Sequence, residues 1–205
     1  MRKNCIILLC LLYMQKIFYV CSYGGSGSYM LCNALKQYGE IKHIHSRNPP
    51  NKLTYIGNDG GGDTYHEWFN GITIPEDKLK NYHVIFIYRN PSFSIPSRFE
   101  IPAHLEHIQC DSKIKLEDIL TTNKDLYKIR EFYDNYTKPN NERNYKIYCV
   151  KYEDIFNNQD KLSDLLEIGK LNLVNESTRK NNENLDKIYA DLIDEMNKNN
   201  FIMIS

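Results

Sequence analysis

The stretch from Gln15 to Gln37 constrains the fold of this 205-residue chain more than any other part of it. Its first part, from Lys16 to Cys21, is apolar, β-branched and aromatic, and its length suits a buried strand. Glycines and serines follow at 22–28, where small residues let the backbone turn tightly. Apolar residues then recur at helical spacing from Tyr29 onward. The stretch therefore predicts a strand, a glycine-rich loop and a helix in direct succession.

A loop of this kind, placed between a strand and a helix, can form a pocket for a phosphate group. Its uncovered backbone N–H groups and the positive end of the helix dipole point to one place, and serine hydroxyls add donors. A plain strand-to-helix turn has the same sequence features, so the loop alone leaves both interpretations open. The candidate phosphate-binding residues are Gly24, Gly25, Ser26, Gly27, Ser28 and Tyr29.

The rest of the chain alternates between predicted strands and predicted helices. Three further apolar runs predict strands, at 41–45, 83–88 and 145–150. Helical patterns follow at about 125–136, 160–169 and 184–198, whereas the polar stretch 101–124 is predicted to be irregular. This alternation indicates an α/β fold with a central parallel sheet flanked by helices. The chain length suits a single domain.

A second motif follows the continuous apolar run at 83–88, which is typical of a strand buried on both faces. Arg89 comes directly after this strand, and Pro91 then opens a helix that carries Ser97. Ligands of parallel sheets bind at the carboxyl ends of the strands, so Arg89 and the glycine loop are predicted to share one edge. A guanidinium and a hydroxyl that converge there make a site for a second phosphate.

Together these motifs resemble the sulfotransferase family. The resemblance rests on the loop at 22–28, on Tyr88-Arg89-Asn90-Pro91 with Ser97, and on the segment Val150-Lys151-Tyr152-Glu153-Asp154, and it covers roughly residues 15–198. It implies a single P-loop-like domain over 15–205 that binds 3′-phosphoadenosine 5′-phosphosulfate as co-substrate, without a metal. The loop would hold the 5′-phosphosulfate, and Arg89 with Ser97 the 3′-phosphate, which Arg179 would cover. The sulfuryl group would pass to a hydroxyl of a carbohydrate or another small acceptor.

The chain departs from the family at Gly25, where members usually carry lysine or arginine. That cation stabilises charge on the bridging oxygen of the leaving phosphate. Arg47, at the end of the second predicted strand, is the candidate replacement, ahead of Lys36. No position matches the family's catalytic base by motif, so the base candidates are chosen by location. They are His66 and Glu67, followed by His104 and His107.

Two other classes of function stay open. One is a catalytically inactive nucleotide-binding module of the same fold, which the glycine at position 25 favours. The other is a P-loop kinase or nucleotide hydrolase. The loop does not end in the Gly-Lys-Ser/Thr sequence that supplies the phosphate lysine and the magnesium hydroxyl of those enzymes, so this class is disfavoured.

Composition restricts the classes of binding partner and the cellular compartment. Lysine plus arginine number 26, equal to aspartate plus glutamate, so no global positive field attracts nucleic acid. The six cysteines form no CxxC pair, which favours free thiols in a reducing compartment and a cytoplasmic location.

The first fourteen residues form a separate apolar extension, 1–14, with a charged start. The apolar run at 5–13 is too short to span a bilayer, so no stable membrane span is expected. Residues 1–14 can act as a signal or anchor, which would direct the chain to the secretory pathway. Alternatively they are dispensable, with Met14 as the real start.

Overall fold

A computed structural model describes residues 16–55, 68 and 71–205, except for the side chain of Ser97. The extension at 1–14 and the base candidates His66 and Glu67 lie outside the described residues. In the described part of the chain, no helix is both long enough and apolar enough to cross a bilayer.

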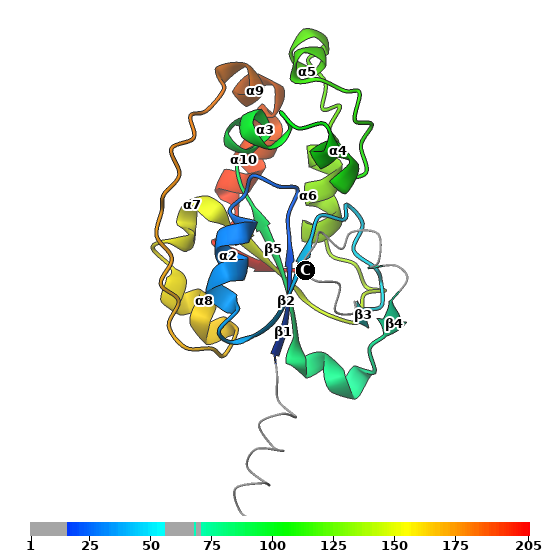
Figure 1. Ribbon diagram of the computed structural model, residues 1–205, viewed down its shortest axis with the longest axis vertical. Helices are drawn as coiled ribbons and strands as arrows, with labels where there is room; N and C mark the ends of the chain where they lie inside the picture. Colours follow the sequence, from blue (N-terminus) through cyan, green and yellow to red (C-terminus); the bar gives the residue numbers. More distant parts are fainter. Residues whose placement is uncertain (1–15, 56–67, 69–70) are drawn as a thin grey trace, which may run out of the picture.

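A five-stranded sheet forms the centre of the molecule, in the order β2-β1-β5-β6-β7 (Figure 1). The strands are β1 Lys16–Cys21, β2 Gly39–Ile44, β5 Tyr82–Tyr88, β6 Ile147–Lys151 and β7 Ile202–Ile204. The first four are parallel neighbours, with β5 between β1 and β6, so the predicted parallel sheet is confirmed. β7 pairs antiparallel with β6 at one edge and was not predicted, because three residues are too few to show a strand pattern.

Helices cover both faces of the sheet, which confirms the α/β class. They are α2 Ser28–Leu35, α3 Pro91–Arg98, α4 Ala103–His107, α5 Leu116–Thr122, α6 Ile129–Thr137, α7 Tyr152–Ile155, α8 Gln159–Leu165, α9 Glu183–Ile188 and α10 Ala190–Lys198. Figure 1 shows α2, α7 and α8 on one side of the sheet and α6 on the other. A 3₁₀ helix, η1 Glu76–Asn81, precedes β5, and a short antiparallel pair, β3 Thr54–Tyr55 with β4 Ile72–Thr73, lies apart from the sheet.

Alternate side chains of the central strands enter two separate apolar cores. Phe18 and Val20 of β1 pack with Leu31 and Leu35 of α2 in one core. The intervening Tyr19 joins the other core, which contains the aromatic residues of α6. Strand side chains point to opposite faces in turn, so a strand covered by helices on both sides is apolar throughout.

The helix predictions need two corrections. The stretch 101–124 contains the short helices α4 and α5, although it was predicted to be irregular. The predicted helix at 184–198 is two helices, because the backbone at Tyr189, with φ −104° and ψ 17°, leaves the helical conformation between them. Pattern alone missed the first pair because each is only about two turns long or shorter.

Candidate functional site

The glycine loop joins the carboxyl end of β1 to the N-terminus of α2, as predicted. Gly24, Gly25 and Gly27 have φ values of 94°, 67° and 81°, in the left-handed region that favours glycine. Gly27 is the N-cap residue of α2, and its carbonyl accepts from the N–H of Leu31 at 3.1 Å. The first N–H groups of a helix lack partners within it, so those of α2 are directed to the loop.

Two close approaches explain why glycine is required here. A Cβ atom on Gly27 would lie 2.5 Å from the ring of Tyr152, and one on Gly25 would lie 2.6 Å from the carbonyl oxygen of Ser94. Both positions also have positive φ. The lysine or arginine expected at position 25 therefore does not fit the loop in this conformation.

The loop serines use their hydroxyls inside the loop. Ser26 Oγ donates to the carbonyl oxygen of Gly24 at 3.1 Å, and Ser22 Oγ donates to Ser28 Oγ at 3.0 Å. Ser26 is fully buried and Ser28 nearly so. Tyr29, in contrast, exposes 69% of its surface on the first turn of α2. Among the predicted loop donors, the backbone N–H groups of the helix end are therefore better placed for a ligand than the serine hydroxyls.

Arg89 lies at the end of β5, on one side of the loop. Its side chain is only 7% exposed, and its guanidinium lies 4.3 Å from the centre of the Tyr152 ring and 5.2 Å from that of Phe93. Its Nη2 donates to Ser177 Oγ at 3.1 Å, while its buried Nε has no hydrogen-bond partner among the described residues. Aromatic rings thus hold the cation in place. The predicted partner Ser97 lies on α3, but its side chain is outside the described part.

Arg179 approaches the same place from the segment before α9. Its Nη1 donates to the carbonyl oxygen of Gly25 at 2.7 Å. Burial lowers the pKa of Arg179 from its ordinary value, and the positive charge of Arg89 lowers it further. Two guanidinium groups that repel each other stabilise an anion placed between them.

A cavity of about 280 Å³ lies between these groups. Its lining residues come from the loop, the ends of β5 and β6, and the segment 174–179: Gly25, Gly27, Met30, Arg89, Tyr152, Val174, Glu176, Ser177, Thr178 and Arg179. The volume is near the lower end of the range for small-molecule sites. The fold therefore brings the loop, Arg89 and Arg179 together. The cavity between them can hold a phosphate group and part of the molecule that carries it.

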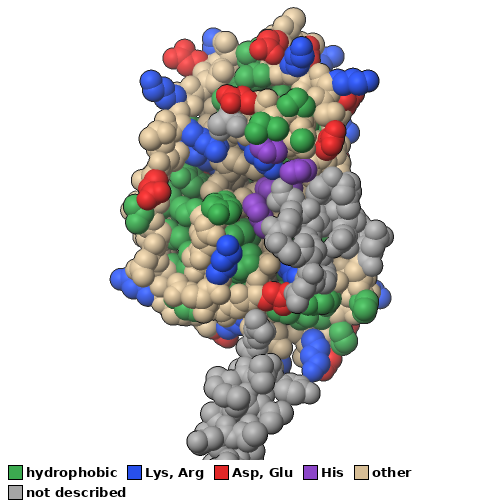
Figure 2. All heavy atoms as spheres, in the orientation of Figure 1, with side chains coloured by type: hydrophobic (Ala, Val, Ile, Leu, Met, Phe, Trp, Pro, Cys, Tyr) green, Lys and Arg blue, Asp and Glu red, His purple; other side chains and the backbone are tan. Residues whose placement is uncertain are grey.

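Histidines gather on the other side of the loop. His43 and His45 lie at the end of β2 with ring centres 4.5 Å apart, and the ring of His107 stacks on His45 at 6.2 Å. His43 Nε2 is hydrogen-bonded to Ser28 Oγ at 2.9 Å, which ties the cluster to the loop. His104 neighbours His107 at 5.7 Å. Figure 2 shows these histidine side chains together beside a hollow in the surface, next to a basic side chain.

The hydrogen bonds of His45 define its neutral form. Its Nδ1 lies 2.6 Å from the carbonyl oxygen of Ser22, so Nδ1 carries the proton and Nε2 the lone pair. Burial lowers the pKa of His45 well below its ordinary value, and neighbouring His43 and Arg98 lower it further. At neutral pH the ring is thus uncharged. In the described part of the chain, no group of three or more side chains could hold a metal ion.

Arg47, the predicted replacement cation, has other contacts. Its Nη2 donates to the carbonyl oxygens of Ile108 at 2.5 Å and Gln109 at 3.3 Å, and its Nη1 lies 3.9 Å from a carboxylate oxygen of Glu131. These contacts hold its buried guanidinium against the segment after α4. The alternative, Lys36, donates to Asn33 Oδ1 on the exposed face of α2. None of the contacts described for either residue is with the loop at 22–28.

Four residues that lie at the site were not predicted from the sequence. They are His43, His45, Arg98 and Ser177. The histidine pair was recognisable, because residues two apart at the end of a strand share one face of the sheet. Tyr152 was named only as part of the segment 150–154, and its ring lies against Arg89 and close to Gly27.

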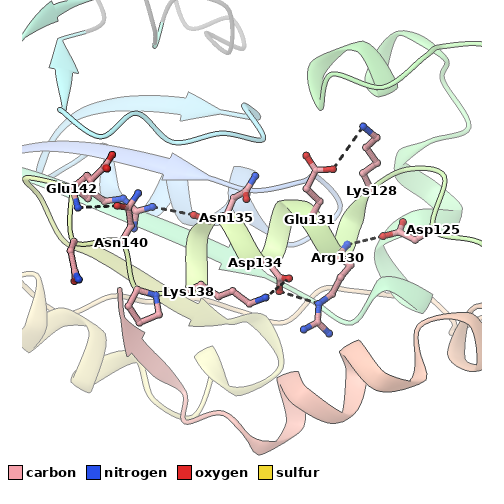
Figure 3. A pocket seen from close by; sticks show the side chains of 12 residues that line it. Asp125, Lys128, Arg130, Glu131, Asp134, Asn135, Lys138, Asn140 and Glu142 are labelled. Carbon is pink, nitrogen blue, oxygen red and sulfur yellow. Dashed lines mark hydrogen bonds and ion pairs between the residues drawn. The ribbon is translucent and has the colours of Figure 1, made fainter.

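A larger depression of about 910 Å³ lies elsewhere, along α6 and the loop that follows it. In Figure 3 its charged side chains point toward one another rather than toward a ligand. Asp134 accepts from Lys138 at 2.7 Å and pairs with Arg130 at 3.0 Å, and Lys128 pairs with Glu131 at 3.8 Å. This surface is a network of solvated ion pairs and does not concentrate one sign of charge.

Comparison with known proteins adds no assignment. No protein-family model matches the chain, and searches of curated proteins and of solved structures found no match.

Proposed function

We propose that the chain is a sulfotransferase-like enzyme with a P-loop-like domain, which uses 3′-phosphoadenosine 5′-phosphosulfate as its sulfuryl donor. The observation that carries the proposal is the convergence of Arg89 and Arg179 with the glycine loop around one cavity. The three parts come from distant positions in the sequence, and each supplies donors suited to phosphate.

The two sides of the loop suit the two halves of the reaction. The arginine side holds the phosphates of the donor, and the histidine side faces the acceptor. In the reaction, a new bond forms between the acceptor oxygen and sulfur. The bond from sulfur to the bridging oxygen breaks, and its electron pair stays on the 5′-phosphate of the leaving bisphosphate. The acceptor's proton passes to a base, for which the histidine cluster beside the loop supplies the candidates.

A nucleotide-binding module without activity is the second candidate. The glycine at position 25 favours it, since the usual loop cation is absent and cannot be accommodated beside Ser94. A P-loop kinase or nucleotide hydrolase is third, and magnesium-dependent hydrolysis of a nucleoside triphosphate would support it.

Two measurements on the wild-type protein test these alternatives. Calorimetric titration with adenosine 3′,5′-bisphosphate is expected to show binding, and its absence would contradict both the enzyme and the module. Transfer of labelled sulfate from the donor nucleotide to a panel of glycans, phenols and peptides is expected to give a labelled product. Nucleotide binding without any labelled product would favour the inactive module.

A further inference from the structure

Arg98 brings a positive charge to the glycine loop from outside it. It is the last residue of α3, and its side chain crosses the loop backbone at Gly24. A Cβ atom added to Gly24 would lie 2.2 Å from Arg98 Nε and 2.7 Å from both Cγ and Cδ. The absence of a side chain at position 24 is therefore what lets Arg98 pass directly over the loop.

Two contacts from α4 hold this arrangement. Arg98 Nη2 donates to His107 Nδ1 at 3.2 Å, and the carbonyl oxygen of Arg98 accepts from His104 Nδ1 at 2.6 Å. The positive charge of Arg98 also lowers the pKa of buried His45, whose ring contacts the carbonyl of Ser22. The Arg98 side chain thus connects the loop backbone at Gly24 with the histidine cluster at His107.

The same helix excludes a cation from the loop itself. A Cβ atom on Gly25 would meet the carbonyl oxygen of Ser94, which also belongs to α3. Helix α3 therefore blocks position 25 with its backbone and supplies an arginine one turn later. An arginine is suited to this place because it stays charged at all relevant pH values and its donors form a fixed fork.

We propose that Arg98 stabilises the negative charge that develops on the oxygen joining the sulfuryl group to the 5′-phosphate, in place of a cation in the loop. This assignment rests on the proposed function. As the bond between sulfur and that oxygen breaks, the electron pair remains on the oxygen, where the Arg98 guanidinium compensates it. The acceptor's proton passes to a neutral imidazole of the adjacent histidine cluster.

Binding measurements test the assignment without relying on activity. Wild type, Arg98→Ala and Arg89→Ala are titrated with adenosine 3′,5′-bisphosphate and with adenosine 3′-phosphate, which lacks the 5′-phosphate. Arg98→Ala is expected to lower affinity for the bisphosphate at least tenfold and to change affinity for the 3′-phosphate less than twofold. Arg89→Ala is expected to weaken both ligands. Arg130→Ala, which removes an arginine from the surface of α6, serves as the matched control.

The outcomes separate the two proposals. If wild type binds neither nucleotide, the proposed function fails and this assignment fails with it. If wild type binds both and Arg98→Ala weakens both equally or neither, the assignment to Arg98 alone is overturned. Arg98→Met keeps an apolar stem over Gly24, so a selective loss in both variants, with unchanged thermal unfolding, attributes the effect to the charge.

The kinetics of sulfuryl transfer, compared between wild type and the Arg98 variants, give a second test. Arg98→Ala is expected to lower kcat about 100- to 1,000-fold, as for loss of a donor to developing charge, with little change in the KM of the donor. Arg98→Lys is expected to restore part of kcat, because it returns the charge without the fork geometry. An unchanged kcat in Arg98→Ala would overturn the assignment.

Discussion

The two sides of the glycine loop differ in the kind of positive charge that they present. On one side, Arg89 and Arg179 are guanidinium groups fixed by aromatic rings and by the loop carbonyl of Gly25. On the other, the rings of His43, His45 and His107 lie together, and His107 accepts a hydrogen bond from Arg98. Permanent charges suit the holding of an anion, whereas imidazoles suit the movement of a proton. In the proposed reaction, the arginine side would bind the donor and the histidine side would take part in proton transfer.

Loss of the loop geometry is expected to have the largest effect, because both sides depend on it. Gly27→Val places a β-branched residue at positive φ and against the ring of Tyr152. Backbone strain and overpacking together are expected to lower the free energy of unfolding by roughly 2–6 kcal/mol, measured by denaturant titration. In the Gly27→Ala variant, the additional substitution Tyr152→Leu should restore the stability that is lost to overpacking. It should not restore the stability that is lost to backbone strain. Wild-type stability in Gly27→Val would show that the loop is not held as described.

Removal of the better-buried arginine comes next. Arg89→Ala is expected to weaken binding of adenosine 3′,5′-bisphosphate by about 1.5–3 kcal/mol, the range for hydrogen bonds to charged groups. Calorimetry with the bisphosphate and with its analogue lacking the 3′-phosphate locates the contact. Equal losses for both ligands would show that Arg89 does not bind the 3′-phosphate, and would leave the arginine side without its expected role.

A smaller loss is expected from Arg179, which is more exposed than Arg89. Arg179→Ala removes one charge and the hydrogen bond to the carbonyl of Gly25. We expect about 0.5–1.5 kcal/mol weaker binding of the bisphosphate, since solvent screens an exposed cation. Lys180→Ala, at the neighbouring position, is the control in the same titration. An effect of Arg179→Ala larger than that of Arg89→Ala would reverse the proposed order of the two arginines.

Mild acid is expected to act on the histidine side and to leave the arginine side unchanged. Burial holds the pKa of His45 well below that of the unfolded chain, so the unfolded state binds the proton first as pH falls below about 6.5. His45 therefore stabilises the fold above that pH, and its contribution declines on acidification. The free energy of unfolding of His45→Gln, measured by urea titration between pH 7.5 and 5.5, should depend less on pH than that of wild type.

Over pH 7 to 8.5, in contrast, bisphosphate affinity should change less than threefold, because guanidinium groups do not titrate there. An affinity that depends strongly on pH in this range would assign the ligand to the histidine side. It would contradict the proposal that the arginine side binds the bisphosphate.

Features that depend on residues close together in the sequence were predicted, whereas contacts between residues far apart in the sequence were not. Apolar patterning predicted the four parallel strands, and the glycine loop was placed correctly between β1 and α2. The short helices α4 and α5 were missed, although α4 supplies two of the clustered histidines. Arg47 was chosen because it follows a strand, but its side chain turns to the carbonyls at 108–109.

The sequence by itself determined the four parallel strands, the loop and the position of Arg89, because each depends on a local pattern: strand burial repeats every two residues, and glycine marks a tight turn. Only the tertiary structure decided which cations reach the loop. Arg179 contacts Gly25 across 154 positions, and Arg98 crosses Gly24 because α3 packs against the loop. Such contacts depend on how the helices pack around the sheet, and no local pattern records that packing.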